Sequence, residues 1–402
     1  MTGTSAADPG TLFGAVPAVV AGLRDVTTVR RRCAEVLDFV RAGESPHFVL
    51  DEARAADVVE RIATMTASRF PDLVVPYHSR WRHFGDRVPE LTPQARVDLT
   101  VVSVLLDAGA GPTWSFFDSR GETLTRSEGL AVASLEAFAV GTFSDDPDDP
   151  YRVDATTLSR IDADELGWVF QVGPHNPLVG LEGRAELLRR LAVALEAPAF
   201  GGRPGGLFNT LTDNQITVPA RDILRALLDG LSAIWPSGQW LDVDGRPWPM
   251  GDVWEHPTGR VPFHKLSQWL TYSLIEPFEW AGVPVTDLDD LTGLPEYRNG
   301  GLLLDTGLIS PRDPAWAAHP ITPADPRVIE WRALTIALLD ELAPAVRDRL
   351  AADHPAFADR ARALPLASLL EGGSWAAGRA IAAERRPDGT PPVTIISDGT
   401  VF

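Results

Sequence analysis

Lys265, Glu296 and Arg298 lie in one short stretch of the chain, residues 261–309, each with apolar residues close by in the sequence. Lys265 begins a predicted helix, and Glu296 follows in a predicted loop, with Tyr297 and Arg298 directly after it. A lysine and an arginine can hold an anionic substrate, and a carboxylate can stabilise a cationic transition state. The stretch therefore indicates enzyme chemistry on a small molecule.

The predicted helix that begins at Lys265 brings several reactive side chains to one face. Helical spacing places Lys265 on the same face as Trp269, Tyr272 and Glu276, with Gln268 beside it. The functional interpretation is a substrate site on this face. The alternative is a partly exposed amphipathic helix with Lys265 and Glu276 in water.

Glu296 also has two interpretations. As a surface acid it would pair with Arg298, an interaction typically worth less than about 1 kcal/mol. As a catalytic group it would face a sugar carbon that develops positive charge, and it would orient or deprotonate the attacking water. Such a carboxylate is effective only in a dry site, so the second interpretation predicts that Glu296 is largely buried.

A glycine-rich turn, residues 105–111, contributes two more candidates. Asp107 would supply a polar group and Trp114 a stacking wall. The alternative is a helix that simply ends at glycine. The turn lacks the third glycine of a dinucleotide fingerprint and the lysine of a Walker sequence, so it does not predict a nucleotide loop.

Residues 78–83 form a dense polar and aromatic cluster that includes His78, Arg80 and Trp81. The arginines could bind a phosphate or carboxylate, whereas two histidines without a third ligand make a metal site improbable. Ser127 stands at a predicted helix start, where it is either an N-cap or part of a phosphate site. The motifs of serine hydrolases and zinc proteases are absent from the sequence.

Composition narrows the class of protein. The formal charge is −19 at pH 7; duplex-binding proteins need a basic face, so nucleic acid is not an expected partner. Cys33 is the only cysteine, which excludes an intramolecular disulfide and a cysteine zinc site. No apolar run approaches roughly 18 residues and no leader is apparent, so we expect a cytoplasmic protein without a membrane span. The sequence leaves a monomer and a homodimer equally open.

Helical periodicity dominates the chain and predicts a mainly α fold with a small β-hairpin element. Residues 1–20 are expected to be a flexible tail and residues 21–402 a single helical domain, with a split near residue 150 as the weaker alternative. Asp244-Gly245 predicts a tight turn within a hairpin over residues 239–254. Helices are predicted at residues 26–42, 51–68, 93–106, 127–138, 156–170, 181–197, 219–234, 326–350 and 364–384 and from Lys265 onward, and a strand is predicted at residues 392–402.

Several long strings show a family resemblance that covers most of the chain. They are VPYHSRWRHFG (75–85), LLDAGAG (105–111), RSEGLAVAS (126–134), FQVGPHNPLVGLEGR (170–184) and PFHKLSQWLTYSLIEPFEWAG (262–282). On these strings the chain resembles the family of the fourth uracil-catabolism protein, whose members were long filed as a domain of unknown function. The resemblance implies a step in uracil breakdown.

A shorter, gapped pattern resembles the queuosine-salvage nucleotide glycosidases, which have a helical, DNA-glycosylase-like fold. It consists of Lys265 and Gln268 on one helix, then Gly282, an acidic turn at residues 287–290, and the Glu296-Tyr297-Arg298 triplet. Phe-Gly-Gly at residues 200–202, followed by Phe208-Asn209, extends the match. The chain carries Glu296 where that family carries aspartate, which implies a different reach and a different substrate.

Together the resemblances imply an N-glycoside hydrolase that needs no metal or cofactor and acts on a nucleoside- or nucleotide-derived small molecule, ribosylurea or its 5′-phosphate. Glu296 would be the catalytic carboxylate, and Lys265 would hold the substrate or Glu296. The implied substrate-binding residues are Arg298, Tyr297, Gln268, Asp107, Trp114, Trp81, Arg80, His78, Ser127 and Asn209. Two alternatives remain: hydrolysis of a C–N bond in an acyclic ureide, and a non-catalytic subunit that binds a ligand.

Overall fold

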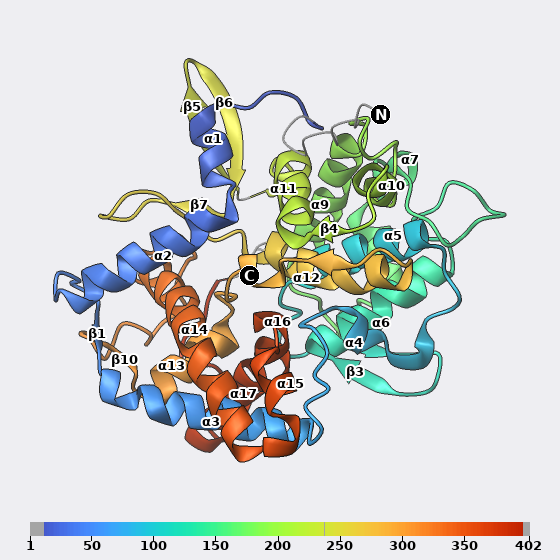
Figure 1. Cartoon of the computed structure of the whole chain (residues 1–402). Coiled ribbons are helices and arrows are strands. Elements are labelled where there is room, and N and C mark those ends of the chain that lie inside the picture. Colours follow the sequence, from blue (N-terminus) through green and yellow to red (C-terminus); the bar gives the residue numbers. More distant parts are fainter. Residues whose placement is uncertain (1–11, 237, 397–402) are drawn as a thin grey trace, which may run out of the picture.

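Helices carry most of the chain in the computed structural model, which describes residues 12–236 and 238–396 (Figure 1). The prediction of a mainly α fold is confirmed. The first half contains α1 (Ala18–Leu23), α2 (Val26–Arg41), α3 (Ala55–Arg69), α4 (Trp81–Phe84), α5 (Pro93–Leu105), α6 (Arg126–Ala139), α7 (Ala155–Leu158), α8 (Ala163–Val169) and α9 (Leu181–Ala194). The second half contains α10 (Gly206–Thr212), α11 (Ala220–Leu231), α12 (Lys265–Trp280), α13 (Tyr297–Asp305), α14 (Pro326–Asp353), α15 (Ala358–Arg362), α16 (Leu366–Leu369) and α17 (Trp375–Arg385).

The strands pair two by two in small sheets. The antiparallel pairs are β1 (Phe48–Leu50) with β10 (Ile309–Pro311), β2 (Ser115–Phe117) with β3 (Thr123–Thr125), β5 (Gln239–Val243) with β6 (Arg246–Gly251), and β7 (Val253–Trp254) with β8 (Val261–Pro262). A parallel pair joins β4 (Val218–Pro219) to β9 (Val285–Thr286). Asp244 and Gly245 have φ angles of 54° and 79°, which is the tight turn that Asp-Gly predicts for the β5–β6 hairpin.

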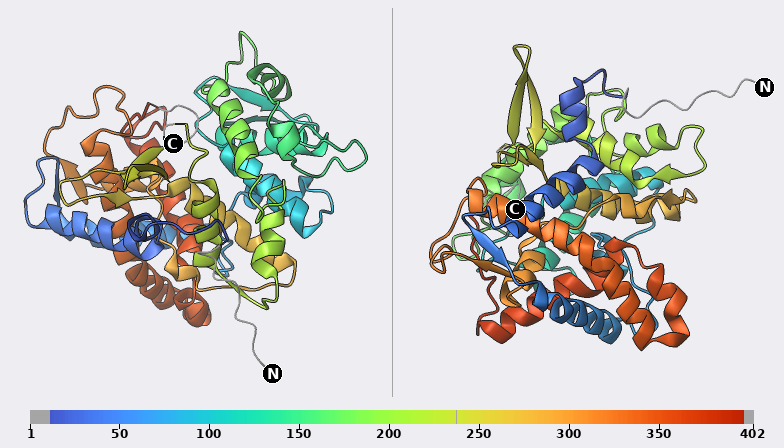
Figure 2. Two further views of the ribbon diagram at one scale, coloured as in Figure 1. Left: turned by 90° about the horizontal axis from the view of Figure 1, so that it is seen from above. Right: turned by 60° about the vertical axis from the view of Figure 1, so that its left-hand side comes forward.

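Helices from distant parts of the sequence pack on one another. α12 packs against α5 and α11, whereas α14 packs against α2 and α3. Figure 2 shows the mid-chain helices (cyan and green) gathered on one side and the N- and C-terminal helices (blue and red) on the other. One connected hydrophobic core includes buried side chains from Val26 to Val393. No helix in the described ranges is both long and apolar enough to cross a bilayer.

Local sequence signals place most helix starts correctly. Thr92 accepts a hydrogen bond from the N–H of Ala95 at 3.2 Å and begins α5, as expected for an N-cap. The prediction of one helix over residues 156–170 is wrong. α7 ends at Leu158, and a new helix starts where Asp162 accepts a hydrogen bond from the N–H of Glu165 at 2.9 Å. The cap on Asp162 competes with continuation of the first helix.

The chain ends differ from the predicted tail and strand. Part of the predicted tail belongs to α1, and Val20 is buried in a small cluster with Met250 and Val253. Residues 1–11 lie outside the described part. At the other end, Ile395 forms a single parallel bridge with Ile321, and the rest of the predicted strand, residues 397–402, also lies outside it.

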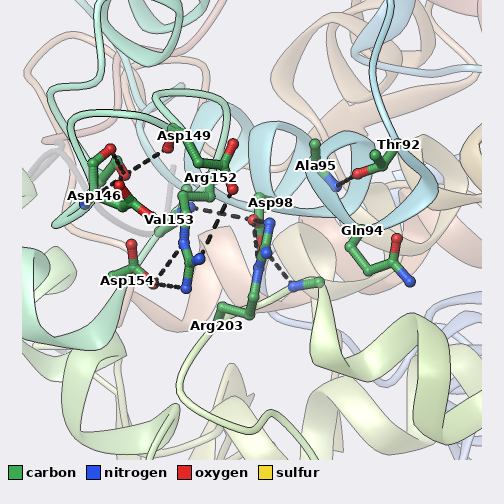
Figure 3. A network of polar contacts seen from close by, with 12 residues as sticks. Thr92, Gln94, Ala95, Asp98, Asp146, Asp149, Arg152, Val153, Asp154 and Arg203 are labelled. Carbon is green, nitrogen blue, oxygen red and sulfur yellow. Dashed lines mark hydrogen bonds and ion pairs between the residues drawn. The ribbon is translucent and has the colours of Figure 1, made fainter.

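The glycine-rich segment at residues 200–206 is held by Asp98 of α5 (Figure 3). Asp98 is fully buried and accepts hydrogen bonds from Arg203 Nε at 2.9 Å, from the N–H of Gly205 at 2.5 Å and from the N–H of Val153 at 3.1 Å. The segment therefore passes so close to α5 that a β-carbon on Gly205 would lie 2.6 Å from the carbonyl oxygen of Gln94. This motif has a structural reason to contain glycine.

We expect Gly205→Ala to lower the free energy of unfolding by about 1–3 kcal/mol, because the added methyl group meets α5 backbone that cannot move freely. Urea unfolding at pH 7 measures the effect. Gly22→Ala is the matched control, since nothing lies within 4 Å of a β-carbon there. Equal stability of the two variants would contradict the assigned close approach.

Candidate active site

Lys265 occupies the first position of α12, and a buried ion pair fixes that end of the helix. The N–H of Lys265 donates to Asp252 Oδ2 at 3.1 Å. Asp252 also receives two bonds from Arg332, at 2.8 and 2.7 Å, and one from Trp254 Nε1 at 2.6 Å. The Arg332 guanidinium holds the pKa of Asp252 down at about 2 although burial alone would raise it. A negative charge at a helix N-terminus is favourable, so Asp252 positions Lys265.

Glu296 does not lie in an open loop: it is the N-cap of α13, a helix that the sequence pattern does not predict. Its carboxylate accepts hydrogen bonds from the N–H of Arg298 at 2.8 Å and of Asn299 at 3.3 Å. The side chain is half-buried rather than fully buried. The carboxylate is thus held at the positive end of a helix with a fixed orientation.

Gln268 and Tyr272 join α12 to the segment that leads into α13. Gln268 Nε2 donates to Thr292 Oγ1 at 2.9 Å, and the N–H of Thr292 donates back to Gln268 Oε1 at 3.0 Å. The Tyr272 hydroxyl donates a hydrogen bond to the carbonyl oxygen of Thr292 at 2.8 Å. Both side chains are fully buried, so they set the spacing between the two helices that carry Lys265 and Glu296. The substrate contact predicted for Gln268 stays a prediction.

Lys265 and Glu296 lie within electrostatic reach of each other. Burial raises the pKa of Glu296, and the positive charge of Lys265 opposes that rise. Burial likewise lowers the pKa of Lys265, and the negative charge of Glu296 opposes that change. His78 and Asp107 belong to the same neighbourhood, because Glu296 and Lys265 act on the pKa of His78, and Lys265 acts on that of Asp107. Four predicted site residues therefore converge.

Arg80 brings the Asp107 turn and the start of α6 to this neighbourhood. Its Nη1 contacts Asp107 Oδ2 at 2.8 Å, and the Ser127 hydroxyl lies 3.0 Å from both Asp107 oxygens. Burial raises the pKa of Asp107 to about 6 against the lowering effect of Arg80. α6 begins at Arg126 after an N-cap at Thr125, so Ser127 is not a cap. Its hydroxyl donates a hydrogen bond to Asp107 instead.

Trp269, one turn along α12 from Lys265, forms a wall against this cluster. Its ring lies 5.8 Å from the Arg80 guanidinium carbon and 6.2 Å from the His78 ring. Glu276, further along α12, accepts a hydrogen bond from the Ser79 hydroxyl. Burial raises the pKa of Glu276 to about 7. Of the face that helical spacing predicts, Lys265 and Trp269 therefore lie at the cluster, whereas Tyr272 is buried in the core.

Three predicted binding residues are not brought to the cluster. Trp81 is buried, with its indole N–H on Thr100 Oγ1 at 3.0 Å, and Trp114 is buried with its indole N–H on the carbonyl oxygen of Phe170 at 3.0 Å. Asn209 is exposed on α10 and accepts a hydrogen bond from Gln94 Nε2 at 2.6 Å. The two indoles are engaged in core packing, and the amide faces the N-terminal end of α5.

The two residues after Glu296 have different surroundings. Arg298 is buried, and its Nη1 donates to the carbonyl oxygen of Gly389 at 3.2 Å, so its guanidinium reaches the C-terminal segment. Tyr297 is 41% exposed, and its ring lies 5.0 Å from the Arg298 guanidinium carbon. Tyr297 is therefore the more accessible of the two to a ligand.

The sequence holds one further signal for this site, and one residue of the site has none. Lys265 is the only lysine among the 36 Lys and Arg residues of the chain, so arginine serves at every other cationic position, whereas this one keeps a compact ammonium group whose pKa responds to burial. Glu371 left no such signal, because it lies inside an ordinary helical pattern. It nevertheless contacts His78 Nδ1 at 3.0 Å and is buried.

We expect Asp252→Asn to lower the free energy of unfolding at pH 7 by about 2–3 kcal/mol, because the shift of the carboxyl pKa from 3.8 to about 2 is lost. The pKa is depressed in the folded state, so this stabilisation is present above pH 3.8 and disappears as the pH falls through about 2. Urea unfolding at pH 7 and pH 3 should therefore show a smaller difference between variant and parent at pH 3. A difference independent of pH would contradict the ion pair.

A family profile described as "Protein of unknown function (DUF1688)" matches residues 22–402. The chain is 37% identical over 446 residues to "Uracil catabolism protein 4" of Lachancea kluyveri, with 95% of this chain and 99% of that protein covered. It is 38% identical over 410 residues to "Protein urg3" of Schizosaccharomyces pombe, with 95% and 99% covered.

Proposed function

The chain belongs to the DUF1688 family, and we propose that it is a hydrolase of uracil catabolism that cleaves the N-glycosidic bond of ribosylurea or its 5′-phosphate. The Lachancea kluyveri relative is named as a uracil catabolism protein, and 99% of its length aligns with this chain. That name supports a role in uracil catabolism. The gapped resemblance to queuosine-salvage glycosidases supports the choice of an N-glycosidic bond as the bond that is cleaved. A DNA-glycosylase-like arrangement of the helices is part of the same proposal.

One observation carries the proposal: the Glu296 carboxylate is fixed at the N-terminus of α13, within electrostatic reach of the ammonium group of Lys265. When the bond between ribose C1 and the urea nitrogen breaks, its electrons leave with the nitrogen and positive charge develops on the sugar ring. Glu296 stabilises that charge. Water then attacks C1 and gives one proton to Glu296. Glu296 passes this proton through solvent to the urea nitrogen, which yields urea and ribose or ribose 5-phosphate and restores the carboxylate.

Lys265 has a defined part in this mechanism. Its charge opposes the rise in pKa that burial imposes on Glu296, so it keeps the carboxylate ionised in a partly dry site. The Arg80–Asp107–Ser127 group lies beside it and offers carboxylate and hydroxyl oxygens to sugar hydroxyls. This polar group and the opposite charges of Lys265 and Glu296 together suit a sugar ring better than an apolar ligand.

The test is to incubate the purified protein with ribosylurea, ribosylurea 5′-phosphate and uridine monophosphate, and to assay urea, uracil and reducing sugar. We expect urea and reducing sugar from one of the first two substrates and no uracil. Cleavage of the ureide without free sugar would replace this proposal with a C–N hydrolase. Binding without turnover of any of the three would indicate a ligand-binding subunit.

A further inference from the structure

Glu371 occupies an unusual place in the fold. It lies in the π-helical turn Leu370–Ser374, between α16 and α17. Such turns are rare and frequently found at functional sites. Gly373 allows the turn to approach α3, because a β-carbon there would lie 2.6 Å from Thr66 Oγ1. The turn thus places the Glu371 carboxylate, 5% exposed, between Arg69 at the end of α3 and His78 of the candidate active site.

The two carboxylate oxygens of Glu371 have different partners. Oε1 accepts a hydrogen bond from Arg69 Nη2 at 3.3 Å and forms an ion pair with Arg82 Nη1. Oε2 lies 3.0 Å from His78 Nδ1. Both arginines can only donate, so the carboxylate is charged and oriented, and the single hydrogen bond left for Oε2 comes from the histidine ring.

This contact fixes the protonation pattern of His78. A carboxylate oxygen only accepts, so Nδ1 must carry the proton, and in a neutral ring Nε2 then carries a lone pair. Burial lowers the pKa of His78 to about 4, which keeps the ring neutral at pH 7. Among the described residues, none forms a hydrogen bond with Nε2.

Nε2 is the second ring nitrogen of His78, the one that Glu371 does not contact. The His78 ring lies 6.2 Å from that of Trp269, one turn from Lys265 on α12. The charges that act on its pKa are those of Glu296 before α13, Lys265 of α12, Arg82 of α4 and Arg69 of α3. The ring therefore lies near Trp269 and within electrostatic reach of the reacting groups of the proposed mechanism.

We propose that Glu371 is a positioning residue that holds His78 as the Nδ1–H tautomer and so presents Nε2 as a hydrogen-bond acceptor for an N–H group of the leaving group. This inference rests on the proposed function and explains how the site would distinguish ribosylurea from uridine. In ribosylurea the glycosidic nitrogen carries a hydrogen, whereas in uridine the equivalent ring nitrogen carries none. An acceptor at this place selects the ring-opened substrate, because a site built to hydrogen-bond one group discriminates strongly against an analogue that lacks it.

The substitution Glu371→Gln reverses the tautomer without changing the size of the side chain. The two arginines require an acceptor at the Oε1 position, so the amide NH2 must take the position of Oε2 and face His78 Nδ1. Nδ1 then accepts a hydrogen bond, and Nε2 becomes the protonated nitrogen. It would meet the substrate N–H as a second donor, and we expect kcat/KM to fall roughly 30- to 100-fold.

The experiment combines spectroscopy with kinetics. Long-range ¹H–¹⁵N correlation spectra of ¹⁵N-histidine-labelled protein distinguish protonated from unprotonated ring nitrogens, and a His78→Gln spectrum assigns the signal. We expect an unprotonated Nε2 in the parent protein and a protonated Nε2 in Glu371→Gln. Glu330→Gln is the matched control, since Glu330 is the partner of a second buried histidine, His256; it should leave both the His78 signals and kcat/KM unchanged.

Each result decides the inference. A parent spectrum with a protonated Nε2 overturns it, whether or not the variant folds. A reversed tautomer in Glu371→Gln with unchanged kcat/KM also overturns it, because the ring would then not act on the substrate. If the parent protein releases no sugar, the proposed function fails, and the specificity fails with it, while the paired spectra still decide whether Glu371 sets the tautomer.

Discussion

Replacing Glu296 by glutamine is expected to lower kcat on the ribosylurea substrate by at least about 10³-fold while the protein stays folded. The amide keeps the size of the side chain but cannot carry the negative charge that stabilises the sugar cation, and it cannot accept a proton from water. Release of urea under saturating substrate measures the effect. Because the loss is in the transition state, KM should change much less than kcat.

Glu296 also caps α13, so a control must separate that role from catalysis. Loss of a negative charge at a helix N-terminus costs roughly 0.3–1 kcal/mol. Asp162→Asn makes the same acid-to-amide change at the N-cap of α8, a site outside the cluster around Lys265. We expect a similar small fall in the melting temperature of both variants and full activity in Asp162→Asn only. Near-normal turnover by Glu296→Gln would disprove the proposed mechanism.

The segments around the candidate site show what a local sequence pattern can and cannot predict. α12 was predicted from its apolar spacing, but α13 was missed. Glutamate is an unusual N-cap, and Gly300 and Gly301 look like helix breakers. The structure gives Gly300 another reason: a β-carbon there would lie 2.7 Å from the Trp331 ring of α14. The glycine allows α13 and α14 to pack closely, which no local pattern reveals.

Distance along the chain explains the remaining omissions. Lys265 and Glu296 were found because they lie in one short stretch. Glu371 meets His78 across 293 positions, and Asp252 meets Arg332 across 80, so each pair depends on how whole helices pack. The two tryptophans show a different limit of the sequence: Trp81 and Trp114 have the residue type of pocket walls, but their indole N–H groups donate hydrogen bonds within the core.

Replacing Lys265 by methionine is expected to lower kcat/KM at pH 7 by roughly 10²-fold and to move the acid limb of the pH–rate profile to higher pH. The sign follows from the charges. Activity requires ionised Glu296, burial raises the pKa of that carboxyl, and Lys265 lowers it. Without the ammonium group the pKa rises further, so more of the enzyme is protonated and inactive at a given pH. An unmoved limb, or one displaced to lower pH, would contradict the assigned role.

Lys265→Arg separates charge from shape at the same position. The guanidinium keeps the positive charge, so the acid limb should stay near its position in the parent protein. Its planar, branched group differs from an ammonium in size and hydrogen-bond geometry, and kcat should therefore still fall. That combination would explain why a chain with arginine at every other Lys or Arg position keeps its single lysine beside Glu296: the site needs a compact cation whose own pKa the neighbouring carboxylate can hold up against burial.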